Sequence, residues 1–363
     1  MIGGPLDAPT FQFHSRCQLP FVTCQLKFLH AKNRLLKSLE NHKLHQNHTM
    51  KLLPLLALSI ITLAAHAQGC SDAGFCTMGA MKPDQPYNKK IDFKLNSIDL
   101  SFYRGTTTLT PIVYVATADM NFSLNRKNTL QLKVPFQYVT GRLAQTSSLS
   151  DISICFTHNL ISSDRFDLNV SFGAKIPTNN SDFKTDEGNA LPMYYQTSLG
   201  TYDLIAGLSL INRKWLFATG IQVPLNANKN QFDWHRWVDN DPDEIAYVQR
   251  YANATELSRG TDIMLRVERN FRLSRFNFSA GLLPIYRIVP DQITNFVGTR
   301  TSFDLAGNEA KGLALSWITT AGYSFNTRSA IKILVGHKIV QREFSPDGLT
   351  RELVTSFTYS YRF

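Results

Sequence analysis

Apolar and polar side chains alternate along most of the chain, in segments of about 10 to 13 residues. The last segment, residues 351–363, is the clearest example. Its Leu353, Phe357 and Phe363 share one face, while polar residues such as Ser356 occupy the other. Because successive residues of a strand point to opposite faces, this period of two predicts β-strands with one apolar and one polar face.

The pattern predicts strands at residues 98–104, 109–124, 129–139, 151–160, 166–177, 199–211, 215–225, 261–270, 276–288, 313–325, 330–343 and 351–363. Tight polar turns between them alternate with longer links, of which 140–150 is one and 226–260 is the longest. Membrane barrels have short periplasmic turns and longer outer loops, whereas a soluble β-sandwich gives no reason for this alternation. The predicted fold is therefore all-β: a transmembrane up-and-down antiparallel β-barrel of about 12 strands.

The stretch that begins at Met50 has the three parts of a secretory signal peptide. Lys51 is basic, an apolar run follows, and Ala65-His66-Ala67 is a small-x-small cleavage site. A transmembrane helix is disfavoured, because about 14 apolar residues fall short of the roughly 20 that span a bilayer. We expect an upstream extension outside the mature protein at 1–49, a signal peptide at 50–67, a periplasmic or plug segment at 68–97 and an outer-membrane barrel at 98–363.

Charge and cysteines add to this picture. The chain carries a net charge of +10, but seven of its 38 Lys and Arg and two of its 28 Asp and Glu precede residue 68, which leaves +5. Without basic runs, this argues against a nucleic-acid partner. Cys70 and Cys76 are close in sequence, so an oxidising periplasm favours a disulfide between them. A lipid-bearing Cys70, free thiols and a metal are the alternatives.

The alternation also predicts which charged side chains face the barrel interior. The candidates for lining a solute path are Lys133, Lys175, Arg266, Glu268, Lys338 and Arg342. Inward carboxylates such as Asp151 and Asp203 nearly balance the basic groups. About twelve strands lie between the filled barrels of eight and the open channels of 16 to 18, so a filled interior and an open pore are equally compatible with the sequence.

The longest predicted loop contains three candidates for binding a sugar or a small aromatic compound, namely Trp234, His235 and Trp237. An acidic run at 239–244 has part of the spacing of a calcium loop but lacks its glycine and its bidentate glutamate. We therefore predict no metal site and no cofactor, and expect a solvated loop that folds over the barrel mouth.

Residues 149–225 resemble the outer-membrane channel family known as the MetA-pathway of phenol degradation family. The matching motifs are Ser150-Asp151, Pro177-Thr178-Asn179 and Gly200-Thr201-Tyr202-Asp203, with Asn179 where that family has glycine. The resemblance implies a transporter-like outer-membrane barrel and a role in passage, but no particular substrate.

The expected function is an outer-membrane channel or transporter for small solutes, hydrophobic or aromatic compounds among them. The alternatives are a structural or adhesive barrel without transport and an outer-membrane hydrolase. No enzyme is predicted, because the sequence contains neither G-x-S-x-G nor H-E-x-x-H. The terminal Phe363 resembles the C-terminal signature of bacterial outer-membrane proteins. It predicts the barrel-insertion machinery as a partner, beside outer-membrane lipid and a small-molecule solute.

Overall fold

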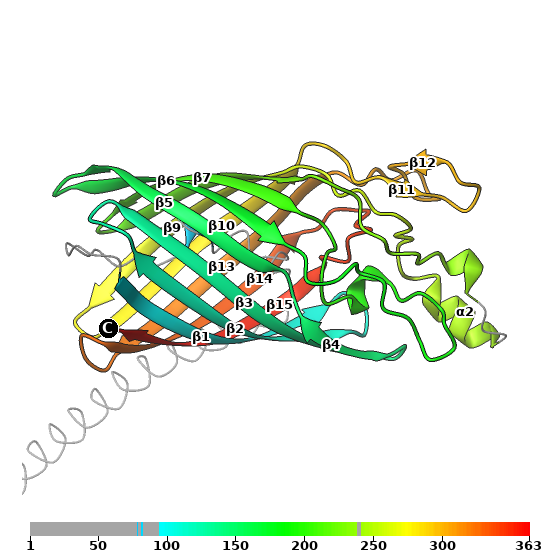
Figure 1. The fold of residues 1–363 in the computed structure, drawn as a ribbon, viewed down its shortest axis with the longest axis horizontal. Helices are drawn as coiled ribbons and strands as arrows, with labels where there is room; N and C mark the ends of the chain where they lie inside the picture. The colour runs from blue at the N-terminus through cyan, green and yellow to red at the C-terminus, as the bar shows by residue number, and fades with distance from the viewer. Residues whose placement is uncertain (1–77, 79–80, 83–93, 238–240) are drawn as a thin grey trace, which may run out of the picture. The chain divides into compact units, whose positions relative to one another are not determined.

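Antiparallel strands close into an up-and-down barrel in the computed structural model, which describes residues 78, 81–82, 94–237 and 241–363 (Figure 1). The wall consists of β1 (Lys94–Thr107), β2 (Ile112–Ser123), β3 (Asn128–Thr140), β4 (Gln145–Leu149), β5 (Ile152–Ser162), β6 (Phe166–Ile176), β7 (Asp203–Asn212), β8 (Trp215–Pro224), β9 (Asp262–Leu273), β10 (Phe276–Arg287), β13 (Gly312–Ser324), β14 (Ser329–Val340) and β15 (Arg351–Arg362).

The wall has twelve strands, because β4 and β5 both pair with β3 and are two halves of one strand. The barrel closes where β15 pairs with β1, in a register that sets Phe357 opposite Phe102. This confirms the predicted all-β barrel. No helix in the described part of the chain is long and apolar enough to cross a membrane.

The alternation in the sequence matches the two faces of the wall. On β6, Phe172 points outward and is 61% exposed, while its neighbour Ser171 is buried in the interior. Phe102 on β1 and Phe357 on β15 are likewise exposed on the outer face. Exposed rings of this kind recur around the barrel and form the apolar outer band that a lipid-facing wall requires.

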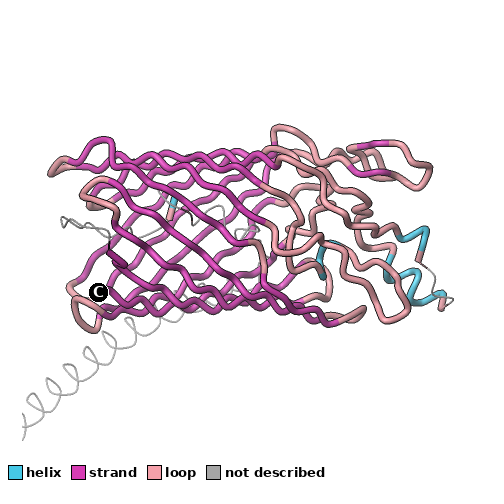
Figure 2. Tube along the Cα trace, viewed as in Figure 1, coloured by secondary structure: helices cyan, strands magenta, loops and turns pink. Residues whose placement is uncertain are grey.

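The connections differ between the two ends of the barrel. The end that holds the C-terminus has tight turns at 124–127, 163–165, 213–214, 274–275 and 325–328. The longer connections gather at the opposite end (Figure 2) and span 177–202, 225–261, 288–311 and 341–350. They contain η4 (Met193–Tyr195), η5 (Trp234–Arg236), α2 (Pro242–Val248) and the short pair β11 (Ile293–Thr294) and β12 (Arg300–Thr301).

Some predicted boundaries were wrong. The expected link at 140–150 is mostly strand, because β4 extends the hairpin with β3 and leaves a turn of only 141–144. Its polar sequence hid this strand, since no alternation marks it. The barrel begins at Lys94 rather than at 98, and β7 begins at Asp203 rather than at 199, after Gly200 adopts a φ of +70°. β14 ends at Val340, so Arg342 lies in a connection.

The predictions for the N-terminal part lie outside the described residues. They comprise the extension at 1–49, the signal peptide at 50–67 and the disulfide candidates Cys70 and Cys76. Of the segment at 68–97, the structure describes Met78, Met81 and Lys82 together with the start of β1. In the described part of the chain, the free cysteine is Cys155, buried on β5.

Candidate functional site

A belt of apolar side chains crosses the middle of the barrel interior. This apolar belt comprises Cys155, Ile205, Ala218, Met264, Leu283, Ile285 and Ile318. The side chains come from the inward register of β5, β7, β8, β9, β10 and β13, and each is buried. Water-filled barrels have polar interiors, so this belt makes one side of the middle section of the lumen apolar.

Two methionines that precede β1 fill this middle section. Met78 and Met81 are both fully buried and pack within the apolar belt. Glycines of the wall make room for them, since a Cβ on Gly207 would lie 3.0 Å from Met81 Sδ and a Cβ on Gly173 would lie 3.0 Å from Met78 Cε. Met78 and Met81 therefore lie in the lumen and narrow it.

An ion-pair cluster fixes the residue that follows these methionines. Lys82 Nζ lies 2.6 Å from Asp99 Oδ2 on β1 and 3.0 Å from Asp119 Oδ2 on β2. Gln131 Nε2 donates to Asp119 Oδ1 at 3.0 Å from the next strand. Buried charges are stable only when paired and hydrogen-bonded, so the cluster anchors the segment to the wall.

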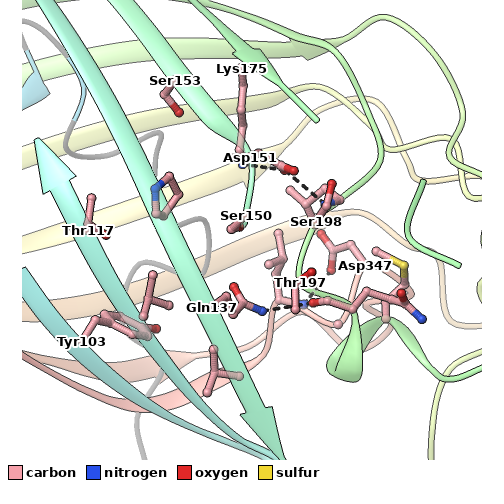
Figure 3. A pocket seen from close by; sticks show the side chains of 18 of the residues that line it. Tyr103, Thr117, Gln137, Ser150, Asp151, Ser153, Lys175, Thr197, Ser198 and Asp347 are labelled. Atoms are coloured by element: carbon pink, nitrogen blue, oxygen red, sulfur yellow. Dashed lines mark hydrogen bonds and ion pairs between the residues drawn. The ribbon is translucent and has the colours of Figure 1, made fainter. Parts of the chain in front are cut away.

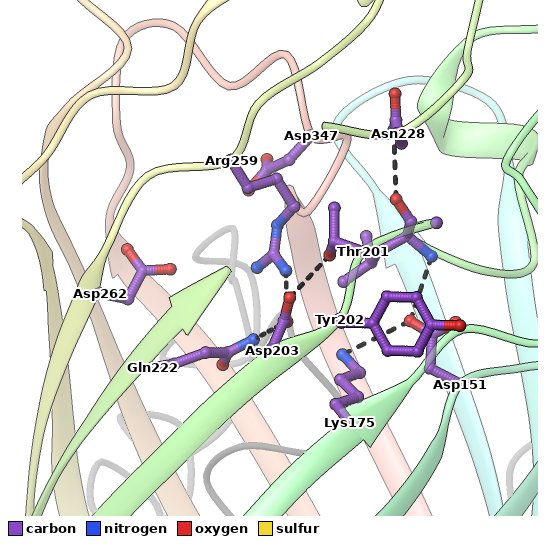
Figure 4. Close-up of polar contacts among 12 residues, drawn as sticks. Asp151, Lys175, Thr201, Tyr202, Asp203, Gln222, Asn228, Arg259, Asp262 and Asp347 are labelled. Atoms are coloured by element: carbon purple, nitrogen blue, oxygen red, sulfur yellow. Dashed lines mark hydrogen bonds and ion pairs between the residues drawn. The ribbon is translucent and has the colours of Figure 1, made fainter. Parts of the chain in front are cut away.

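The predicted lumen residues face inward but do not form one ring. Lys133 on β3 and Lys338 on β14 are buried in the interior. Lys175 Nζ lies 3.8 Å from Asp151 Oδ2, as Figure 4 shows. Arg266 and Glu268 pair with each other along β9. Most of these charges are thus held by nearby partners.

A second charged network, the rim network, joins the barrel edge to two connections. Arg287 Nη2 lies 2.7 Å from Asp262 Oδ2, and Arg287 Nη1 lies 2.9 Å from Asp347 Oδ2 and pairs with Asp291. Arg342 Nη1 lies 3.4 Å from Asp262 Oδ1. Burial raises the pKa of Asp291 to about 6. Burial also opposes the ionisation of Asp347, but the two arginines hold its pKa below the usual range.

The connection at 177–202 is fastened to the wall by Asp203. Its carboxylate accepts hydrogen bonds from Thr201 Oγ1 at 2.7 Å and from Arg259 Nη1 at 2.8 Å (Figure 4). Beneath this connection lies a cavity of only about 70 Å³, where Gln137 Nε2 donates to the carbonyl of Gln196 at 3.0 Å (Figure 3). That volume holds about two water molecules.

The outer loops form an aromatic cap. Of the three predicted loop candidates, one is buried inside this cap and two lie at its edge. Trp237 is buried in the cap with its ring 6.1 Å from that of Phe232, so it acts as core. Tyr247 and Tyr251 hydroxyls hydrogen-bond at 2.8 Å in the same cap. Trp234 is only partly buried and packs against the edge of the cap, and His235 stacks on it at 3.5 Å.

Sequence reasoning missed Met78 and Met81, and two of the three carboxylates of the rim network, Asp291 and Asp347; the third, Asp262, was expected to face inward. A signal for the methionines was present, because Gly207 and Gly220 face inward and pair directly across β7 and β8. Asp291 and Asp347 lie in connections, where no period applies. Across residues 78, 81–82, 94–237 and 241–363, no group of three or more His, Cys, Asp or Glu could hold a metal ion.

No family model and no curated relative matches the sequence. Among solved structures, an outer-membrane channel from Pseudomonas putida F1 matches with a TM-score of 0.53 and 12% identity, over 77% of this chain and 99% of that chain. The NanC porin matches at 0.42 and 10% identity over 73% and 100% of the two chains, and the KdgM porin at 0.40 and 9% identity over 74% and 99%. The similarity at 0.53 shows a shared outer-membrane barrel fold; the two lower scores carry no argument.

Proposed function

We propose that the protein is a bacterial outer-membrane channel that passes small solutes of apolar or aromatic character through its lumen. The observation that carries this proposal is the apolar belt. A channel for ions or sugars needs a polar path, whereas the belt gives this lumen an apolar surface. The exposed rings on the outer wall support the membrane location, and the tight turns support a periplasmic C-terminus.

We also infer that the chain is a divergent member of the MetA-pathway of phenol degradation family. The motif residues support this, because Asp151 and Asp203 both fasten connections at the loop end of the barrel. Asp151 Oδ2 accepts from the backbone N–H of Leu199 at 3.1 Å, beside the break between β4 and β5. These are structural roles, so the inference concerns fold and passage and names no substrate.

Uptake of an apolar fluorescent probe tests the proposed function. Cells that make the protein should take up N-phenyl-1-naphthylamine faster than cells with an empty vector. Replacing Leu283 with Asp places a charge in the apolar belt and should lower the protein-dependent rate about tenfold or more, because a buried unpaired charge costs several kcal/mol. Leu283→Met keeps volume and polarity and should keep most of the uptake.

Equal uptake with and without the protein would contradict the proposal and favour the structural or adhesive barrel. Uptake that is insensitive to Leu283→Asp, in a variant that still folds into the membrane, would place the path outside the belt. The shared fold with an outer-membrane channel supports passage over the hydrolase alternative.

A further inference from the structure

The outer loops enclose a second cavity that the proposed lumen path does not use. This outer basin has a volume of about 590 Å³ and lies among the connections 225–261, 288–311 and 341–350. All of its lining residues belong to connections rather than to the barrel wall. Pockets of about 300–1,000 Å³ are the usual size for small-molecule sites.

One wall of the outer basin is a ladder of three rings from two different connections. The rings of Trp234 and His235 are 3.5 Å apart and inclined by 25°. The ring of Phe296 lies 5.2 Å from that of His235 and is inclined by 32°. Asp233 Oδ1 lies 2.7 Å from His235 Nδ1 and sets the orientation of the middle ring. The ladder thus presents aromatic faces at fixed positions.

The other wall is formed by two apolar side chains of the connection 288–311 that point into water. Val297, between β11 and β12, is 78% exposed, and Leu305, in the turn that follows β12, is 84% exposed. Figure 1 shows β11 and β12 beyond the ends of the barrel strands, so the lipid-facing wall does not account for this exposure. Contiguous exposed apolar side chains on a soluble surface mark a binding site.

The hairpin of β11 and β12, which carries Phe296 and Val297, is held by contacts with the connection 225–261. Ile293 pairs with Thr301 and is buried in a small core below the hairpin. Arg300 Nη1 donates to the carbonyl of Glu256 at 2.7 Å, and Thr294 Oγ1 donates to Glu256 Oε2 at 2.8 Å. The apolar side chains therefore stand on a fixed scaffold, which lowers the entropic cost of binding.

The charges around the outer basin favour an uncharged ligand. Its lining contains one arginine, Arg250, and two carboxylates, Glu343 and Asp304. The carboxylate of Asp304 accepts from the backbone N–H groups of Ala306 at 2.9 Å and Asn308 at 2.8 Å, so its own turn uses it. The formal charges of Arg250, Glu343 and Asp304 sum to −1, so the lining disfavours an anion. The carboxylate that Arg250 does not offset, Asp304, is already hydrogen-bonded within its own turn and so is not free to recruit a cation.

We propose that the outer basin binds one uncharged, planar aromatic compound, packed against the ring ladder of Trp234, His235 and Phe296 and covered by Val297 and Leu305. Flat aromatic faces favour a flat aromatic partner over a saturated ring of the same size. The proposal rests on the proposed channel for its role, as a site that collects solute at the outer face, but the binding itself is independent of passage.

Equilibrium dialysis of the purified full-length mature barrel in detergent tests the proposal, with empty micelles as the blank. The probe is 2-naphthol, and decahydro-2-naphthol is its saturated counterpart. We expect saturable binding of one 2-naphthol per barrel and about tenfold weaker binding of the saturated compound. Trp234→Ala and Phe296→Ala should each weaken 2-naphthol binding about tenfold. Phe325→Ala removes an exposed ring from a turn at the opposite end and should change affinity less than twofold.

Wild-type affinity in both ladder variants, or binding that never saturates, would overturn the proposal. Leu305→Ser replaces Trp234→Ala if that variant fails to fold, because Leu305 is almost fully exposed. The uptake assay run on the same variants separates the two conclusions. Saturable binding without uptake would contradict the proposed channel but not the binding site in the outer basin. Uptake without binding would contradict the binding site but not the channel.

Discussion

Removal of the two methionine side chains from the lumen should open the barrel. In the variant Met78→Ala with Met81→Ala, the segment before β1 loses its contacts with the apolar belt, where both side chains are fully buried. Burying one such side chain is worth about 1.5–3 kcal/mol, so the pair contributes about 3–6 kcal/mol to keeping the segment in the lumen. This loss shifts the ratio of docked to undocked segment by a factor of about 100 or more.

Single-channel recording in planar bilayers measures this shift. The wild-type barrel should show rare, short openings, and the double variant should be open for a much larger fraction of the time. Met193→Ala is the matched control, because it removes a buried methionine that packs in a cluster of the outer connections and not in the apolar belt. A double variant with the wild-type record would refute the reasoning and show that other side chains close the lumen.

Three further predictions concern stability. Lys82→Gln removes the cation that bridges Asp99 and Asp119 and should lower the free energy of unfolding in lipid vesicles by about 3–5 kcal/mol, with partial recovery in Lys82→Arg. An unchanged free energy of unfolding would show that the cluster is not an anchor. The pKa of Asp291 is raised by burial to about 6, above the unfolded value, so its contribution is full below pH 4 and is lost as pH rises through 6. Between pH 4 and pH 7, urea titrations should therefore show the free energy of unfolding of the wild type falling by up to about 3 kcal/mol relative to that of Asp291→Asn. A difference between the two proteins that stays constant with pH would show that burial does not raise the pKa of Asp291. Tyr247→Phe removes the hydroxyl that hydrogen-bonds to Tyr251 in the aromatic cap, which should destabilise the cap by about 1 kcal/mol and speed proteolysis of the connection 225–261. An unchanged rate of cleavage would show that this hydroxyl does not stabilise the cap.

The sequence predicted the wall of this protein well because every strand obeys the same constraint. A wall with lipid outside and a polar lumen forces a period of two, and that period placed Phe172 outside and Lys175 inside. The same constraint does not mark β4, which extends the hairpin with β3. The residues of β4 are mostly polar and show no apolar alternation, so the pattern predicts a link there instead of a strand.

The candidate site was harder to predict because much of it lies off the strands. The lumen is narrowed by Met78 and Met81, which precede the first strand and follow no period. Asp347 reaches the rim network from a connection, and only the folded chain brings it to Arg287. Trp234 and Trp237 are close in sequence, yet one borders the outer basin and the other is core. Composition cannot separate such roles, because they depend on which segment packs above each ring.

The central claim is that the lumen passes apolar solutes and rejects charged ones. N-phenyl-1-naphthylamine and 8-anilino-1-naphthalenesulfonate share the same rings and differ by one sulfonate, so their initial uptake rates isolate the effect of charge. With the empty-vector rate subtracted, we predict that cells making the wild-type protein take up the uncharged probe at least about tenfold faster, because a charge entering the apolar belt loses its hydration. Equal protein-dependent rates for the two probes, or faster uptake of the sulfonate, would contradict an apolar solute path.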